Sequence, residues 1–241
     1  MHIILHLESE KPIILPIHYN HMVQALIYNT IDGSLADFLH TKGYGEGRNF
    51  KLFCFSNLRG HFDVKSMPGF IIFDKKIDLE VSSPISDFCE SLANGMLKKN
   101  LLLGENNLIV QGVTVDWKKV SGTSMTAVTL SPIVVYSTLL RPDGRKYTCY
   151  YQPGEDDFGR IVDENLRKKY RALYNEEPAV GKVSVKCLKQ PRLHVVNYKD
   201  TVIKGYTGKM RLEGPPELLQ MALDAGLGSK NSQGFGCLRL W

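Results

Sequence analysis

The sequence of 241 residues predicts an α+β protein built from two tandem βαββαβ units. Short runs rich in β-branched residues alternate with stretches of helical periodicity, and this alternation occurs twice along the chain. A polar segment at residues 121–126 separates the two occurrences. The length allows one large or two small domains. We therefore predict an N-terminal domain over residues 1–123 and a C-terminal domain over residues 124–241.

The first half reads as strand, helix, strands, helix, strand. An Ile- and Leu-rich run opens the chain, and the next segment places its apolar residues at helical spacing. Closely spaced glycines then mark a loop after a short second helix. Pro84 is expected at the entry of the last helix, because proline is tolerated in the first turn. The strands are predicted at 2–7, 50–56, 70–74, 77–82 and 108–117, and the helices at 20–31, 35–40 and 84–98.

The second half repeats this order. Residues 181–188 alternate apolar and polar side chains, as in a half-buried strand, and Pro215 and Pro216 open the last helix. Strands are predicted at 127–137, 181–188, 203–213 and 235–241, with a charged amphipathic helix at 156–173. The order in both halves is that of the ferredoxin-like unit, a fold shared with RNA-recognition modules. Fold alone does not assign function.

Positive charge is concentrated in the second half of the chain. The net charge is +5; residues 1–125 carry 12 basic and 13 acidic side chains, whereas residues 126–241 carry 18 and 12. We expect any surface that docks an anion to lie mainly in the second half. A solvated basic surface is the alternative.

Composition excludes several classes of protein. The cysteines are odd in number and form no C-x-x-C pair, which argues against a zinc site or a disulfide framework. Three histidines, His18, His21 and His40, have no carboxylate or cysteine beside them at ligand spacing. The N-terminus does not resemble a signal peptide, and no apolar run is long enough to span a membrane. We therefore expect a cytoplasmic protein with reduced cysteines and with no metal ion, cofactor or membrane attachment.

The segment GLGSKNSQGFG at residues 226–236 lies between the last helix and the last strand. Glycine allows close approach of the backbone, and consecutive N–H groups form anion-binding concavities. The segment is neither a Walker A loop nor a dinucleotide fingerprint. The alternative is a helix C-cap followed by a flexible connection. The predicted contacts to an anionic ligand are Gly226, Gly228, Ser229, Lys230, Asn231, Ser232, Gln233, Gly234, Phe235 and Gly236.

This glycine-rich end and four further motifs occur in a familiar order along nearly the whole chain. The further motifs are PIHYNHMVQALIYN at 16–29, LADFLH at 35–40, KLFCFS at 51–56 and VTLSPI at 128–133. Together they resemble the CRISPR-associated repeat-processing endoribonucleases of the Cas-six type. Members of this family cut precursor CRISPR RNA (pre-crRNA) into guide RNAs (crRNA).

The resemblance implies a metal-independent cleavage in which the 2′-hydroxyl of the RNA is the nucleophile. The products would carry a 5′-hydroxyl and a 2′,3′-cyclic phosphate. The family's catalytic residues fall on Tyr28, His40 and Lys51. His40 would be the general acid, Tyr28 a base or an orienting group, and Lys51 a cation that stabilises the transition state. The loop before Lys51 resembles an insertion, so Lys42 or Arg48 could supply this cation instead.

Further residues are assigned more loosely. Basic side chains of the second half are expected to hold the RNA backbone without reading its sequence. His21 is a helix cap or a second catalytic imidazole, and the basic cluster at residues 167–171 is expected to be the solvated face of a helix. The predicted backbone contacts are Arg141, Arg145, Lys186, Lys189 and Arg192.

Two other functions stay open at this point. One is an RNA-binding module of the same family that does not cleave, and the other is an unrelated enzyme that binds a small phosphate ligand. The expected partner is CRISPR repeat RNA. The sequence leaves open whether the protein forms a homodimer or joins other proteins of an effector complex.

Overall fold

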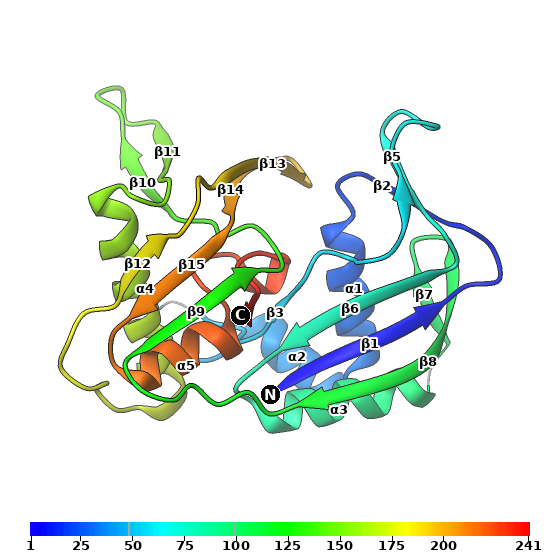
Figure 1. Ribbon diagram of the computed structural model, residues 1–241, viewed down its shortest axis with the longest axis horizontal. Coiled ribbons are helices and arrows are strands. Elements are labelled where there is room, and N and C mark those ends of the chain that lie inside the picture. The colour runs from blue at the N-terminus through cyan, green and yellow to red at the C-terminus, as the bar shows by residue number, and fades with distance from the viewer. Residues whose placement is uncertain (48, 99) are drawn as a thin grey trace.

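The computed structural model describes residues 1–47, 49–98 and 100–241. Two α/β halves lie side by side, and in each half the helices cover one face of a sheet (Figure 1). Both chain termini lie near the middle of the molecule, where the halves meet. The helices are α1 (Asn20–Thr30), α2 (Gly33–Thr41), α3 (Ser86–Lys98), α4 (Asp156–Tyr174) and α5 (Pro216–Ala225).

The main sheet of the first half has the strand order β3-β6-β1-β8-β7. Its pairings are antiparallel, with His2 opposite Ser82 on one side and opposite Asp116 on the other. In this sheet, the fourth strand of the βαββαβ unit lies beside the first, followed by the third and the second. The strands are β1 (His2–Glu8), β3 (Cys54–Phe55), β6 (Lys76–Ser82), β7 (Leu101–Leu103) and β8 (Asn106–Asp116).

The main sheet of the second half repeats this arrangement with the order β12-β15-β9-β16. Its strands are β9 (Ser124–Thr129), β12 (Ser184–Cys187), β15 (Lys209–Glu213) and β16 (Leu238–Leu240). The same fourth-first-third-second order in both halves confirms the prediction of two tandem ferredoxin-like units. The boundary after residue 123 stays a prediction.

Hairpins that project from the two main sheets are the chief departure from the predicted elements. The expected strand 203–213 is two strands, β14 and β15, and β14 pairs with β13 in a separate ribbon. The expected strand 127–137 likewise divides around Pro132 into β9 and β10. The projecting strands are β2 (Ile13–Pro16), β4 (Phe62–Asp63), β5 (Phe70–Phe73), β10 (Tyr136–Leu140), β11 (Lys146–Tyr150), β13 (Arg192–Tyr198) and β14 (Thr201–Thr207).

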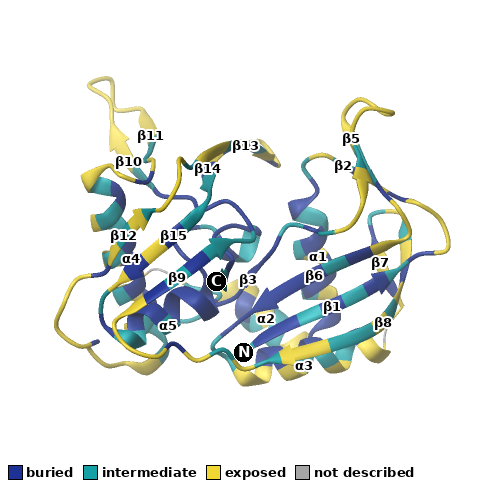
Figure 2. Cartoon of the chain, in the orientation of Figure 1, coloured by how far each residue is buried: buried dark blue, intermediate teal, exposed yellow. Residues whose placement is uncertain are grey.

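The strand expected at 50–56 is reduced to β3 for a local reason. Leu52 has φ of 51°, which takes the chain out of the extended conformation. Leu52 is buried in the core of the second half, whereas Phe53 stacks on Phe88 in the core of the first, with ring centroids 4.7 Å apart. The segment before β3 therefore crosses from one core to the other. Figure 2 shows the buried residues along the sheets and the exposed ones at the hairpin tips.

A fully buried carboxylate, Glu80 on β6, lies where the two halves meet. His2 Nδ1 is 3.1 Å from Oε1, and Arg239 of the second half donates to Oε2. Arg59 and Lys118 approach the carboxylate to 3.3 and 3.5 Å. Burial alone would raise the pKa of Glu80, but hydrogen bonds from His2 and Arg239 and the charge of Lys118 lower it to about 2.

A second carboxylate extends this cluster into the second half. Asp224 on α5 accepts from the amino group of Met1 at 3.2 Å, and His2 Nε2 is 3.4 Å from the same oxygen. Burial lowers the pKa of His2, but the carboxylates of Asp224 and Glu80 outweigh this effect and raise it. The buried imidazole thus lies between one carboxylate from each half.

Candidate active site

A cleft of about 740 Å³ lies between the two halves. One wall is formed by α1, α2 and the segment before β3, and the other by the turn of the β13–β14 hairpin and the glycine-rich loop. The first half contributes His21, Gln24, Tyr28, His40 and Lys51, and the second half contributes Tyr198, Lys199, Lys230, Ser232 and Gln233. The three residues predicted to be catalytic therefore border one cleft, although they come from three separate segments.

His40 and Lys51 are neighbours in this cleft. His40 lies in the last turn of α2 with its side chain exposed, and Lys51 Nζ donates to the His40 backbone oxygen at 3.2 Å. Partial burial lowers the pKa of Lys51 from its usual value. This contact holds the Lys51 ammonium at the backbone of His40, at the end of α2.

Tyr28 faces the cleft from α1. Its ring packs edge-on against Phe53, with centroids 5.9 Å apart. Burial, together with the neighbouring Tyr198, raises the pKa of Tyr28 to about 12. A phenol with this pKa keeps its proton at neutral pH, so Tyr28 can donate a hydrogen bond but is a poor base. Of the two roles predicted for it, the structure favours orientation.

His21 lines the same cleft and is not a side-chain cap of α1. The cap position is Tyr19, which makes no side-chain capping bond. His21 Nδ1 is 3.2 Å from the backbone oxygen of His18. Because a carbonyl oxygen only accepts, this contact places a hydrogen on Nδ1, and in the neutral ring it leaves Nε2 with a lone pair.

The glycine-rich loop is mostly buried and internally bonded. Backbone N–H groups of the loop donate to protein carbonyls, including Ser229 to Val134 at 2.8 Å and Gly236 to Pro132 at 2.9 Å. A Cβ at Gly236 would lie 2.0 Å from the oxygen of Leu227, and its φ is 74°. These glycines therefore serve close packing as well as the turn.

Burial reduces the number of predicted loop residues that can contact a ligand in the cleft. Lys230, Ser232 and Gln233 are half-buried and line the cleft. The other predicted residues are buried: Gly226, Gly228, Ser229, Asn231, Gly234, Phe235 and Gly236. The loop thus offers the cleft these three residues rather than a row of free backbone N–H groups.

A buried lysine on α4 holds the loop in place. Lys169 is 2% exposed, and its Nζ donates to the backbone oxygens of Gly226 and Gly228 at 2.6 and 3.1 Å and to Asn231 Oδ1 at 2.7 Å. Charged side chains are rarely buried unless they are paired or fully hydrogen-bonded. The basic cluster at 167–171 is therefore not entirely a solvated helix face.

Replacing this lysine is expected to loosen the loop. Lys169→Met keeps the length of the side chain but leaves three buried acceptors without this donor, so the free energy of unfolding should fall by about 2–3 kcal/mol. Urea unfolding measures this change. Lys168→Met, at an exposed neighbour on the same helix, is the control and should be neutral. Equal stability of the two variants would show that Lys169 does not hold the loop.

The basic residues predicted to hold the RNA backbone lie elsewhere. Arg141 and Arg145 are at the exposed tip of the β10–β11 hairpin, where Arg141 stacks over Tyr147. Lys186 is exposed on β12 and Arg192 begins β13, with Lys189 in the connection between them. None of these five is among the described residues that line the cleft. Their predicted contacts would require RNA that extends beyond it.

Lys51 lines the cleft, as do Lys199 and Lys230 of the second half. Lys42 lines a neighbouring groove of about 660 Å³ together with α4. Arg48 lies outside the described residues. The cleft is also lined by residues that the sequence did not indicate as site residues: Gln24, Ala25, Tyr198, Lys199, Asp200 and Thr201. The polar pair Lys199–Asp200, between two β-branched runs, was the available signal for this turn.

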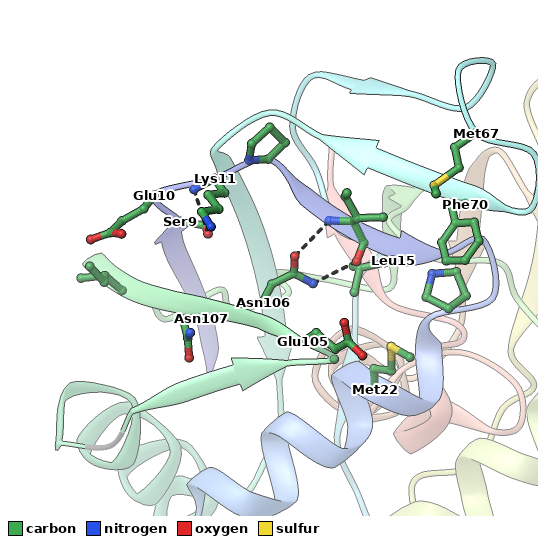
Figure 3. A pocket seen from close by; sticks show the side chains of 15 residues that line it. Ser9, Glu10, Lys11, Leu15, Met22, Met67, Phe70, Glu105, Asn106 and Asn107 are labelled. Carbon is green, nitrogen blue, oxygen red and sulfur yellow. Dashed lines mark hydrogen bonds between the residues drawn. The ribbon is translucent and has the colours of Figure 1, made fainter.

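A larger groove, of about 1040 Å³, lies in the first half (Figure 3). Met22, Met67 and Phe70 provide apolar surface there, while Asn106 closes one side through hydrogen bonds with the backbone of Ile14 at 3.0 and 2.9 Å. None of the described residues that line this groove is a histidine or a tyrosine. Its size therefore does not make it the better candidate for chemistry.

The described residues contain no group of three or more His, Cys, Asp or Glu side chains placed to hold a metal ion. Within the same residues, no helix has both the length and the apolar character needed to cross a membrane.

Comparison with known proteins identifies the family. Family models described as CRISPR-associated protein Cas6, N-terminal, and CRISPR associated protein Cas6, C-terminal, match residues 14–114 and 113–240. The chain is 27% identical to CRISPR-associated endoribonuclease Cas6 1 of Methanocaldococcus jannaschii over 238 residues, covering 98% of this chain and 91% of the relative. It is 29% identical to CRISPR-associated endoribonuclease Cas6 of Pyrococcus furiosus over 245 residues, covering 97% and 86%. A solved structure described as CRISPR associated protein Cas6 matches with a TM-score of 0.81 at 26% identity, covering 100% of this chain and 99% of the other. The chain belongs to the Cas6 family of CRISPR-associated proteins, the family that its sequence motifs resemble.

Proposed function

We propose that this protein is a metal-independent endoribonuclease that cleaves CRISPR repeat RNA within pre-crRNA to release crRNA. The observation that carries the proposal is the convergence of His40, Tyr28 and Lys51 on one cleft, opposite Lys230 of the second half. Relatives over nearly the full length of the chain are named as endoribonucleases. A cytoplasmic location, a homodimer and association with other effector-complex proteins stay predictions.

The proposed reaction transfers the phosphate within the RNA. The 2′-oxygen attacks the adjacent phosphorus, a P–O2′ bond forms, and the P–O5′ bond breaks. The 2′-hydroxyl proton passes to a base, and the leaving 5′-oxygen receives a proton from an acid. The products are a 2′,3′-cyclic phosphate and a 5′-hydroxyl, with no water or metal ion consumed.

The cleft holds two imidazoles for these proton transfers. We assign His40 as the general acid and His21, through the lone pair on Nε2, as the general base. Tyr28 donates a hydrogen bond that orients the phosphate, because its raised pKa keeps the hydroxyl protonated. Lys51 and Lys230 place positive charge where the transition state gains negative charge.

Cleavage of the protein's own repeat RNA in excess EDTA tests this chemistry. The wild-type protein should cut the RNA, and the product should carry a 2′,3′-cyclic phosphate that phosphatase removes only after acid opens the ring. A single deoxyribonucleotide at the cut site should abolish cutting, because it removes the nucleophile. Cutting that needs Mg²⁺ and tolerates the deoxyribonucleotide would contradict the mechanism. Tight, salt-sensitive binding without cutting would indicate a non-cleaving module instead.

A further inference from the structure

The side chain of Gln24 joins the two walls of the cleft. Gln24 lies on α1, one helical turn before Tyr28. Its Nε2 donates to the backbone oxygen of Ser232 in the glycine-rich loop at 2.7 Å, and its Oε1 accepts from the hydroxyl of Tyr198. Both contacts are made to the second half of the chain. One amide therefore connects α1 with two separate segments across the cleft.

The two contacts fix the orientation of this amide. A backbone oxygen can only accept, so it must face Nε2, and the hydroxyl of Tyr198 then meets Oε1 as a donor. Tyr198 is 7% exposed, so water competes little for its hydroxyl. The chain of bonds from Tyr198 through Gln24 to Ser232 has a single consistent direction.

Tyr198 also carries the turn that closes the cleft. It ends β13, and Lys199, which follows it, has φ of 51° in the left-handed region. The β13–β14 hairpin reaches toward α1 (Figure 1). Lys199, at the turn of this hairpin, lines the cleft. A turn in a sparsely populated conformation persists where its surroundings determine it. The bond from Tyr198 to Gln24 ties this turn to the first half.

The distance between the two walls of the cleft matters for the reaction, because both walls contribute groups that are proposed to act on the RNA. The proposed acid, base and orienting group lie on the first half, whereas Lys230 lies on the second. Groups that act on one phosphate must be held close to their productive geometry. A bridge across the cleft therefore affects the reaction more than it affects the initial capture of RNA.

We propose that Tyr198 and Gln24 are positioning residues for RNA cleavage, which act by holding the hairpin turn and the glycine-rich loop at a fixed distance from Tyr28. This inference rests on the proposed endoribonuclease function. It adds two residues that do not themselves exchange protons with the RNA.

Three variants test the bridge under single-turnover conditions. Tyr198→Phe removes only the hydroxyl, Gln24→Met removes both amide contacts at similar length, and the third variant combines them. Each should cleave ~10–100-fold more slowly than the wild type, because misplacement by about 1 Å costs this much. The Kd for repeat RNA with a deoxyribonucleotide at the cut site should change by less than about twofold, since phosphate capture is retained. The double variant should be no slower than the slower single variant, because both changes break one chain.

Tyr150→Phe is the matched control. The hydroxyl of Tyr150, on β11, donates to the backbone oxygen of Val202 at 2.9 Å. Val202 lies on the β13–β14 hairpin that carries Tyr198, so this bond lies within the second half. This variant should cleave at the wild-type rate. An equal loss in Tyr150→Phe, an undiminished rate in Tyr198→Phe, or a Kd that rises as much as the rate falls would overturn the inference. Failure of the wild type to cleave would instead overturn the proposed function on which it rests.

Discussion

His40→Ala is expected to lower the cleavage rate by ~10²–10⁴-fold, the range of a lost general acid. Without the imidazole, the 5′-oxygen receives no proton from His40, and the other histidine of the cleft, His21 on α1, is assigned as the base. The affinity for uncleaved RNA should be retained, because the side chain of His40 is exposed and its removal leaves the rest of the cleft in place. Single-turnover cleavage and a filter-binding titration with deoxyribonucleotide-substituted RNA measure the two quantities separately.

His61→Ala is the control for this prediction. His61 is an exposed histidine whose Nδ1 pairs with Asp74 at 3.0 Å, outside the cleft, and its removal should leave the rate unchanged. His21→Ala tests the assignment of the general base separately. A wild-type rate in His21→Ala would reject the base assignment alone, whereas a wild-type rate in His40→Ala would reject the proposed mechanism.

Glu80→Gln is expected to lower the free energy of unfolding by about 3 kcal/mol at neutral pH. The substitution keeps the shape of the side chain, but it removes the negative charge that Arg239, Lys118 and His2 share. A pKa lowered from 4.5 to about 2 corresponds to a stabilisation of about this size. Urea unfolding monitored by circular dichroism measures the loss.

The contribution of Glu80 should also appear in the pH dependence of the free energy of unfolding. The stabilisation by Glu80 is present above pH 4.5 and is lost as the pH falls toward 2. The fall in the free energy of unfolding over this pH range should therefore be smaller in Glu80→Gln. The pKa of His2 is raised, so its contribution is present below pH 6.5 and is lost as the pH rises through the folded-state pKa. Glu177→Gln, at an exposed carboxylate paired with Arg171, is the control and should unfold as the wild type does. If the free energy of unfolding of Glu80→Gln falls below pH 4.5 as steeply as that of the wild type, the cluster does not hold the halves together.

The long elements of the fold were predictable because their patterns are strong. The helices α1, α3 and α4 begin and end within a few residues of the predicted ranges, since each presents an apolar face to a sheet. Of the hairpin strands, β5 was predicted at 70–74, whereas β11 and β13 were missed because they are largely exposed. A strand that buries neither face has little hydrophobic alternation to detect.

The sequence by itself determined the family, the two ferredoxin-like units and the candidates Tyr28, His40 and Lys51, because periodicity and ordered motifs are local properties of the chain. Only the tertiary structure decided that these three residues share a cleft with Lys230. It also turned most of the glycine-rich loop from an exposed anion site into a buried segment held by Lys169, and it raised the pKa of Tyr28. Burial and hydrogen-bond partners depend on which distant segments meet, and residues such as Gln24 and Tyr198, far apart in the chain, carry no local sign that they will bond to each other.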